Sequence, residues 1–254
     1  MRPMFFSSQA PAALAALSQA VSRWGQHAYE EADVLVAIGG DGTMLETLHR
    51  PNPRRLPLYG LHRGTVGFLM NHDDGDGVES LDARVADATP HTLAPVEALL
   101  TDGAGALHRL LAFNEVSMLR AGPRAAHLRI SVDGVVRLER LIGDGALLAT
   151  PAGSTAYNAS IQGPILPLEA GVLSLGGIAV YRPRRWRGAL LPQAATVVFD
   201  VLDADQRPVL ASADSTSVAD VRRVLVRQAP EESQTLLFDP GSSLSDRLLA
   251  EQFL

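Results

Sequence analysis

The stretch VLVAIGGDGTMLE, residues 34–46, joins a continuous apolar run to a glycine-rich turn and an amphipathic segment. A short apolar run that ends in glycines is typical of a strand buried on both faces of a sheet. A helix pattern over 12–24 precedes this strand, and a second helix, 43–50, and a second apolar strand, LPLYGLH (56–62), follow it. Strands that alternate with helices pair in parallel. We therefore expect residues 1–92 to form an α/β domain with a doubly wound parallel sheet.

The first residues of the chain raise the question of a signal peptide, because residues 3–22 carry no charge. The polar segment SSQAP, residues 7–11, interrupts the apolar core that a signal peptide needs. Apolar residues from Leu14 to Trp24 then recur at helical spacing, with Ser7 or Ser8 as the expected cap and Pro11 in the first turn. We expect a strand, a loop and a helix here. No stretch reaches the roughly 18 to 20 apolar residues of a membrane span, so we expect a cytoplasmic protein with no membrane partner.

The second half of the chain is rich in β patterns. Five segments between about 93 and 228 combine apolar residues with Gly, Asp and Pro breaks, and VDGV (132–135) is typical of a hairpin turn. Helical periodicity is confined to 155–180. We expect 93–235 to form a mainly β, NAD-binding domain. Residues 236–254 are expected to pack back on the first domain, with a short helix in SLSDRLLAEQFL (243–254).

The charged residues narrow the possible functions. All 22 basic residues are Arg, so the lysine-bearing phosphate loop and Schiff-base chemistry are excluded. A net charge of −6 without a dense basic run argues against a nucleic-acid partner. The cluster YRPRRWRG (181–188) is either a solvated loop or a contact for an anionic ligand or a partner subunit. The chain has no cysteine, hence no disulfide or thiolate metal site.

The turn GGDGT, residues 39–43, has two interpretations. It is either a tight strand-to-helix turn without a ligand, or a phosphate site. In the second case Gly39, Gly40 and Gly42 remove Cβ atoms where a phosphate chain approaches, and Thr43 caps a helix that faces the anion. Asp41 would repel phosphate directly. It is better suited to act as a base towards a hydroxyl, or through a metal ion bridging to the phosphate.

Two further groups of polar residues follow in the β-rich half. Asn114 and Glu115, in FNEVSMLR (113–120), point to opposite faces within a strand, but at a strand end both reach one ligand. An amide and a carboxylate together match ribose hydroxyls and an adenine edge. Asp144 lies in a second Gly-Asp-Gly turn, and TPAGSTAY (150–157) leads into a helix with Tyr157 and Ser160. Such a loop is an anion or polar-ligand site, and the tyrosine ring is suited to stack on a base, although a single hydroxyl here is more often a helix cap.

The order GGDGT, NE, GDG and TPAGSTAYNASIQGPI resembles the NAD kinase family, which phosphorylates the adenosine 2′-hydroxyl of NAD to make NADP. The resemblance covers about residues 33–215. GGDGT alone also occurs in lipid kinases and phosphofructokinases, so the long TPAGSTAY run is the discriminating part. The resemblance implies a two-domain enzyme that uses Mg²⁺ and either ATP or polyphosphate, and that forms a homodimer or homotetramer.

The resemblance also implies roles for individual residues. Asp41 would be the base, with Gly42 beside it, and Glu115 would contact ribose. Asp144 would reach the nicotinamide end, often in a neighbouring subunit, and Asp214 matches an aspartate of a late strand next to the site. The positions that match the adenine pocket are Phe68, for which core packing is the alternative, and Asn114, Thr155, Ala156, Tyr157 and Ser160. No residue is assigned as a metal ligand.

The chain departs from the family pattern at two places. Gln162 precedes Gly163 where relatives have glycine, with no histidine after Pro164, and Ile142 stands where some relatives have Arg. Both departures affect how phosphates and subunits are contacted. Two alternatives to an NAD kinase stay open at this point. A lipid kinase would need a membrane-binding face, for which no basic amphipathic helix is found, and a non-catalytic dinucleotide-binding module would bind NAD without turnover.

Overall fold

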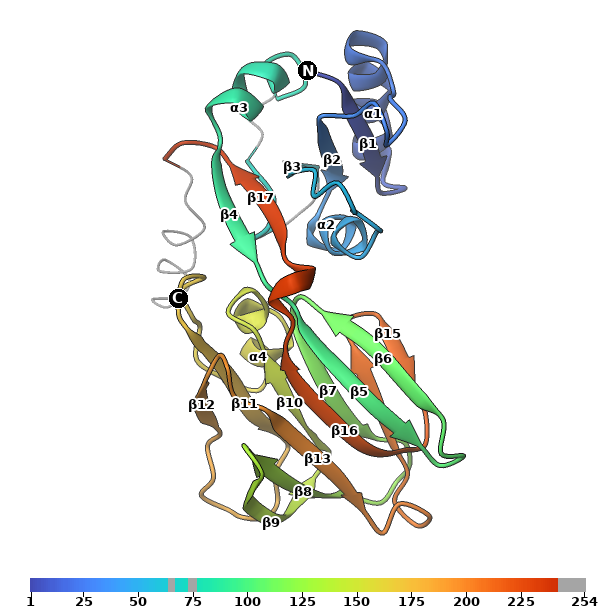
Figure 1. Ribbon diagram of the computed structural model, residues 1–254, viewed down its shortest axis with the longest axis vertical. Helices are drawn as coiled ribbons and strands as arrows, with labels where there is room; N and C mark the ends of the chain where they lie inside the picture. Colours follow the sequence, from blue (N-terminus) through green and yellow to red (C-terminus); the bar gives the residue numbers. More distant parts are fainter. Residues whose placement is uncertain (64–66, 73–76, 242–254) are drawn as a thin grey trace. The chain divides into compact units, whose positions relative to one another are not determined.

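The computed structural model describes residues 1–63, 67–72 and 77–241 (Figure 1). The chain divides into two compact units. The first comprises Met1–Leu93 and the described part of Ser233–Leu254, and the second comprises Ala94–Glu232. The helix expected within 243–254 lies outside the described residues. Within the described ranges, no helix is both long and apolar enough to span a bilayer.

The first unit is built on a five-stranded sheet with the order β1-β2-β3-β17-β4. Its strands are β1 (Pro3–Ser7), β2 (Val34–Gly39), β3 (Leu58–His62), β17 (Gln234–Phe238) and β4 (Thr89–Leu93). Pairing is parallel from β1 to β17, and β4 runs antiparallel to β17. All six residues of β2 are buried, as the continuous apolar run predicts. The strand β17 was not anticipated from the sequence.

Helices cover both faces of this sheet. Alternate β2 residues from Val34 to Ile38 pack in one core cluster with α1 (Pro11–Trp24) and with Leu81 of α3 (Leu81–Asp87). On the other face, α2 (Asp41–Leu48) lies against β2, and Gly60 of β3 makes room for the Met44 side chain. The expected doubly wound arrangement is therefore confirmed. The expected serine cap of α1 is wrong, because Ala10 occupies the N-cap without a side-chain bond, whereas Pro11 does stand in the first turn.

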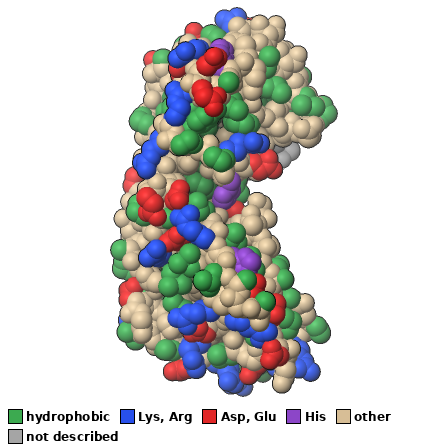
Figure 2. Space-filling model, turned by 45° about the vertical axis from the view of Figure 1, so that its right-hand side comes forward, with side chains coloured by type: hydrophobic (Ala, Val, Ile, Leu, Met, Phe, Trp, Pro, Cys, Tyr) green, Lys and Arg blue, Asp and Glu red, His purple; other side chains and the backbone are tan. Residues whose placement is uncertain are grey.

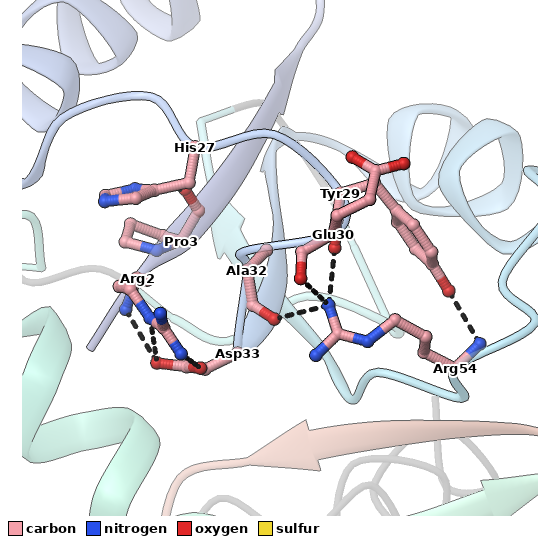
Figure 3. Close-up of polar contacts among 8 residues, drawn as sticks. All are labelled: Arg2, Pro3, His27, Tyr29, Glu30, Ala32, Asp33 and Arg54. Carbon is pink, nitrogen blue, oxygen red and sulfur yellow. Dashed lines mark hydrogen bonds and ion pairs between the residues drawn. The ribbon is translucent and has the colours of Figure 1, made fainter.

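Polar contacts hold the loop that precedes β2 (Figure 3). Arg2 forms an ion pair with Asp33 at 2.9 Å, which joins the start of β1 to that of β2. The Arg54 guanidinium donates to the carbonyl oxygens of Tyr29, Glu30 and Ala32 at 2.6 to 3.1 Å. These bonds satisfy carbonyl groups that have no strand partner. They hold the entry of the buried strand that leads to the glycine-rich turn.

The second unit contains two six-stranded antiparallel sheets, which confirms the expected mainly β character. The first, called the β10 sheet, consists of β12 (Ala189–Pro192), β11 (Val172–Ile178), β10 (Gly145–Ala149), β7 (Glu115–Arg120), β14 (Val209–Ala213) and β15 (Thr216–Val218) in this order. The second consists of β6 (Leu107–Ala112), β5 (Val96–Asp102), β16 (Val221–Gln228), β13 (Val197–Leu202), β8 (Ala126–Val132) and β9 (Val135–Gly143). One apolar core cluster includes residues of both sheets.

Two local expectations for this unit have opposite outcomes. The hairpin at VDGV is confirmed, because Asp133 and Gly134 join β8 to β9 with positive φ at both residues. The helical pattern over 155–180 is largely wrong. Only η1 (Ala152–Thr155) and α4 (Tyr157–Ser160) are helical there, and 172–178 form the strand β11. A third short helical turn of the unit is η2 (Pro230–Glu232).

Acidic and basic side chains are interspersed on the visible face of the molecule, so neither charge is concentrated on that face (Figure 2).

Candidate active site

In the first unit, the glycine-rich turn connects β2 directly to α2. Gly40 is the N-cap and Asp41 is the first helical residue, so the expectation that Thr43 caps the helix is wrong. Thr43 instead lies inside the first turn. Gly39 has to be glycine for packing, because a Cβ there would come within 2.4 Å of Thr43 Oγ1. The threonine thus packs on the turn that it was expected to cap.

Gly42 differs from Gly39. A Cβ added at Gly42 would meet no atom of the described chain within 4 Å, and the residue is exposed on the first turn of α2. Packing inside this unit therefore does not require glycine at position 42. Free N–H groups of a helix N-terminus favour anions, so this exposed backbone is suited to a phosphate group.

The Asp41 carboxylate is held by backbone groups of the segment after β3. The Phe68 N–H donates to Oδ2 at 2.8 Å, and the Leu69 N–H donates to Oδ1 at 2.9 Å. Gly67 permits this approach, because a Cβ there would lie 3.0 Å from Asp41 Oδ1. Asp41 is half-buried and so is Phe68, whose ring is not part of the fully buried core. The carboxylate is thus oriented by two backbone N–H groups.

In the second unit, Glu115 is the first residue of β7, and Asn114 precedes the strand. The pair therefore lies at a strand end. The Asp214 carboxylate accepts the N–H groups of Phe113 at 2.7 Å, Asn114 at 3.0 Å and Glu115 at 3.2 Å. Asp214 itself has a φ of 49° in the turn between β14 and β15. Its side chain thus orients the backbone of the strand end.

The Glu115 carboxylate is the most perturbed acid of this site. Burial, followed by the nearby Asp214 charge, raises the pKa of Glu115 to about 7, although the Tyr157 N–H donates to the carboxylate and opposes the change. Its Oε2 atom is buried and finds no hydrogen-bond partner among the described residues. An unpaired buried acceptor is unfavourable unless a ligand group reaches it. A ribose hydroxyl is a donor of the right kind.

The run TPAGSTAY packs tightly on this strand end. Thr150 Oγ1 donates to the Phe113 carbonyl at 2.5 Å, and the Thr150 N–H donates to the Asn114 carbonyl at 2.9 Å. A Cβ at Gly153 would lie only 2.2 Å from that same Asn114 oxygen. Glycine at 153 is therefore required for η1 to lie against the strand end. Thr155 and Ala156, both half-buried, follow at the junction between η1 and α4.

Two buried polar residues that sequence reasoning missed hold the loop after α4. Ser154 Oγ donates to the Pro151 carbonyl at 2.7 Å and accepts the Leu166 N–H at 3.0 Å. Asn158 donates to the Pro164 carbonyl at 2.9 Å and accepts from Ser174 Oγ at 2.9 Å. Their positions next to Thr155 and Tyr157, four residues apart in the same run, were the available signal. Buried polar groups with satisfied bonds specify one loop conformation.

Tyr157 and Asp144 are related through strand β10. The Tyr157 ring packs with Leu147 and Ala149 on one face of this strand. Burial, then the charges of Asp144 and Glu115, raise the pKa of the Tyr157 phenol. Asp144 immediately precedes β10, whereas Ala149, at the other end of β10, pairs with Glu115. Asp144 is half-buried and forms an ion pair with Arg120.

Ser160 ends α4 and is exposed, and with Tyr157 it lines a cavity of about 750 Å³ inside the second unit. The structure thus brings most of the expected residues of this unit together around the strand end and α4: Asn114, Glu115, Thr155, Ala156, Tyr157, Ser160 and Asp214. Asp41, Gly42 and Phe68 form the second group, in the first unit.

Comparison with known proteins identifies the family. Residues 8–88 match the family described as ATP-NAD kinase N-terminal domain. A protein named NAD kinase from Cereibacter sphaeroides is 54% identical over 250 residues, which cover 98% of this chain and 97% of that protein. Another protein named NAD kinase, from Hyphomonas neptunium, is 48% identical over 253 residues, covering 100% of this chain and 98% of that protein.

Solved structures share the fold. A yeast NADH kinase complexed with NADH superposes with a TM-score of 0.84 at 19% identity, covering 99% of this chain and 86% of that one. An NAD kinase from Archaeoglobus fulgidus in complex with ATP gives a TM-score of 0.79 at 22% identity, covering 100% and 99%. Because about half of the residues are identical to curated relatives over nearly the whole length of both proteins, the chain belongs to the NAD kinase family.

Proposed function

We propose that this chain transfers a phosphoryl group to the adenosine 2′-hydroxyl of NAD and so produces NADP. Relatives named NAD kinase that are 48 to 55% identical over nearly the whole chain support this activity. The observation within the structure that carries it is the buried, unpartnered Oε2 of Glu115, which lies at the strand end next to TPAGSTAY. A ribose hydroxyl donating to this atom would satisfy it.

Substrate binding is assigned to the second unit. The Tyr157 ring and Asn114 would face the adenine, and Glu115 would accept a hydrogen bond from ribose. Asp214 acts indirectly, since its carboxylate orients the backbone of 113–115. Thr155, Ala156 and Ser160 complete the set in this unit. Phe68, in the first unit, remains a proposed NAD-binding residue.

The reaction step is assigned to Asp41. Its carboxylate accepts the proton of the 2′-hydroxyl while that oxygen forms a bond to the terminal phosphorus of the donor. The bond from that phosphorus to the bridging oxygen breaks, and the shortened donor leaves with the electron pair. Hydrogen bonds from Phe68 and Leu69 hold the carboxylate in place for this step. The backbone at Gly39, Gly40 and Gly42 and the first turn with Thr43 receive the donor phosphates.

ATP is the first proposed donor, because an NAD kinase from A. fulgidus was solved in complex with ATP. Polyphosphate is a second donor to be tested. Mg²⁺ commonly binds one or two carboxylates together with substrate phosphates. The described residues hold no cluster of three or more His, Asp or Glu that would bind a resident metal. We propose that Mg²⁺ would enter bound to the donor phosphates, where it would neutralise part of their charge.

We further propose that the protein acts in the cytoplasm as a homodimer or homotetramer. Asp144 lies at the end of β10 opposite to the Glu115 pair and is half-buried, with part of its side chain accessible. From this position, its assigned contact with the nicotinamide end would be made in the site of a neighbouring subunit.

The test is incubation with NAD, Mg²⁺ and either ATP or polyphosphate, followed by an NADP-specific assay. We expect NADP to form with at least one donor. Diacylglycerol and Mg·ATP form the parallel reaction for the lipid-kinase alternative. NAD binding without any NADP formed would identify a non-catalytic dinucleotide-binding module, and transfer to diacylglycerol alone would identify a lipid kinase.

A further inference from the structure

The cavity of about 750 Å³ in the second unit extends beyond Tyr157 and Ser160. Strand β11 and the segment 179–190 form its other walls, and Arg184, Trp186 and Arg187 line it. None of its described lining residues is an Asp or a Glu. The cavity therefore combines two guanidinium groups, an indole and hydroxyl groups, with no carboxylate to neutralise the positive charge.

The two cavity arginines lack an acidic partner. Within the described residues, Arg184 lies over the Tyr181 ring at 5.9 Å, and no ion pair involves Arg184 or Arg187. Elsewhere in this unit arginines are commonly neutralised, as Arg222 is by Asp205 and Asp220. An uncompensated pair of guanidinium groups beside a cavity favours an anionic ligand.

The segment that carries these arginines is fixed to the sheet at both ends. At its start, the N–H groups of Tyr181 and Arg182 donate to the Ile142 carbonyl at 2.8 and 3.1 Å. At its end, Gly188 approaches the Leu175 carbonyl so closely that a Cβ would lie 2.5 Å from it, and β12 then pairs with β11. Between them, Trp186 packs against the core cluster. The arginines on either side of Trp186 are thus presented from an anchored segment, which lowers the entropic cost of binding.

We propose that Arg184 and Arg187 form a phosphate site in this cavity, which binds a phosphate group attached to the adenosine that Tyr157 and Ser160 receive. This inference rests on the proposed function for the identity of the nucleoside. Guanidinium groups bind phosphate through paired, charge-assisted hydrogen bonds. Two phosphates of the reaction belong to adenosine: the 5′-diphosphate shared by NAD and NADP, and the 2′-phosphate that only NADP carries. In both cases the positive cluster of 182–187 is a ligand contact and not merely a solvated loop.

The chain provides a matched control in Arg185. It is exposed, carries the same charge and is adjacent in sequence, but it does not line the cavity. A general electrostatic effect would respond to Arg185→Ala about as strongly as to Arg187→Ala. A phosphate site in the cavity would respond to the cavity arginines alone.

The experiment measures the Kd of NAD, NADP and inorganic pyrophosphate by calorimetry for the wild type, Arg185→Ala and the double variant Arg184→Ala/Arg187→Ala. We expect the double variant to raise the Kd of NADP at least about tenfold and Arg185→Ala to change it less than about twofold. An increase for NADP alone assigns the site to the 2′-phosphate, and equal increases for NAD and NADP assign it to the 5′-diphosphate. Unchanged Kd values for both dinucleotides, in a double variant with the wild-type melting temperature, would overturn the proposal.

Two further measurements distinguish a failure of the phosphate site from a failure of the proposed function. NADP formation by the wild type tests the kinase assignment without any arginine variant. Weaker pyrophosphate binding by the double variant would support the phosphate site even if the wild type made no NADP. The Kd of NADP should also rise more steeply with NaCl in the wild type than in the double variant, and equal salt dependences would count against the site.

Discussion

Replacement of Glu115 by glutamine should make the second unit more stable at neutral and alkaline pH. The pKa of Glu115 is raised from 4.5 to about 7 by burial and by the Asp214 charge. A glutamine side chain has nearly the same size and does not titrate, and its amide oxygen can still accept the Tyr157 N–H. The variant therefore removes the ionisation while it keeps the packing.

The sign and size of this change in stability follow from the linkage between proton binding and folding. Because the folded pKa exceeds the unfolded one, the native state retains its proton where the unfolded state has lost it, so stability falls as pH rises from 4.5 to about 7. Each unit of difference between the folded and unfolded pKa corresponds to about 1.4 kcal/mol of unfolding free energy. Ionisation of Glu115 therefore lowers the stability of the wild type by about 3 kcal/mol above pH 7. Between pH 5 and pH 8, the free energy of unfolding of Glu115→Gln should rise by about 2 to 3 kcal/mol relative to the wild type.

The assay is urea denaturation of both proteins at several pH values between 5 and 8. The chain has two tryptophans, Trp24 in the first unit and Trp186 in the second. Both proteins should carry Trp24→Phe, so that fluorescence reports the unit that contains Glu115. Comparing the two proteins at each pH cancels every other titrating group. If their free energies of unfolding change in parallel over this range, Glu115 does not have the raised pKa.

Three further predictions concern the site. Gly42→Ala should leave the melting temperature unchanged or slightly higher, since no described atom outside its own stretch of helix lies within 4 Å of the added Cβ and alanine favours helices. Its kcat/KM should nevertheless fall at least about tenfold if a phosphate group approaches that backbone. Full activity of this variant would contradict a phosphate contact at Gly42. Tyr157→Ala should raise the KM for NAD roughly 5- to 100-fold through lost stacking, whereas Tyr157→Phe should stay within about threefold because the ring is kept. An unchanged KM in folded Tyr157→Ala would assign the ring to packing. Because Asp144 is assigned to a neighbouring subunit's site, activity per chain should fall on dilution below the assembly constant, and a fully active monomer in sedimentation would contradict this.

Local patterns predicted the parts of the fold that short segments determine. The buried strand 34–39, the helix from Pro11 to Trp24 and the hairpin at Asp133 and Gly134 each have a signal in adjacent residues. The strand β11 was misread as helical, because a short apolar run fits either structure until its pairing partners are known. β17 was missed because its partners, β3 and β4, lie more than 140 residues away in sequence.

The site was predictable in residue types but not in their environments. The motifs identified Glu115 and Asp214 by resemblance, but the burial of Glu115 and the three N–H groups that Asp214 accepts depend on the folded strand end. Likewise, the arginine cluster left two interpretations open. The choice between them depends on which arginines line a cavity, and only the packing of Trp186 and β11 determines that.

Asp41→Asn tests the proposed base most directly, by kcat and NAD affinity measured on the same folded preparation. Asn keeps the size and one of the two acceptor positions now used by Phe68 and Leu69, so a melting temperature must accompany the kinetics. Glu46→Gln, an exposed carboxylate on the same helix, is the matched control and should be fully active. We expect Asp41→Asn to lower kcat by about 10² to 10⁴, equivalent to roughly 3 to 5 kcal/mol of barrier, with the Kd for NAD changed less than about tenfold. A folded variant that keeps more than about a tenth of the wild-type kcat would show that Asp41 is not the base.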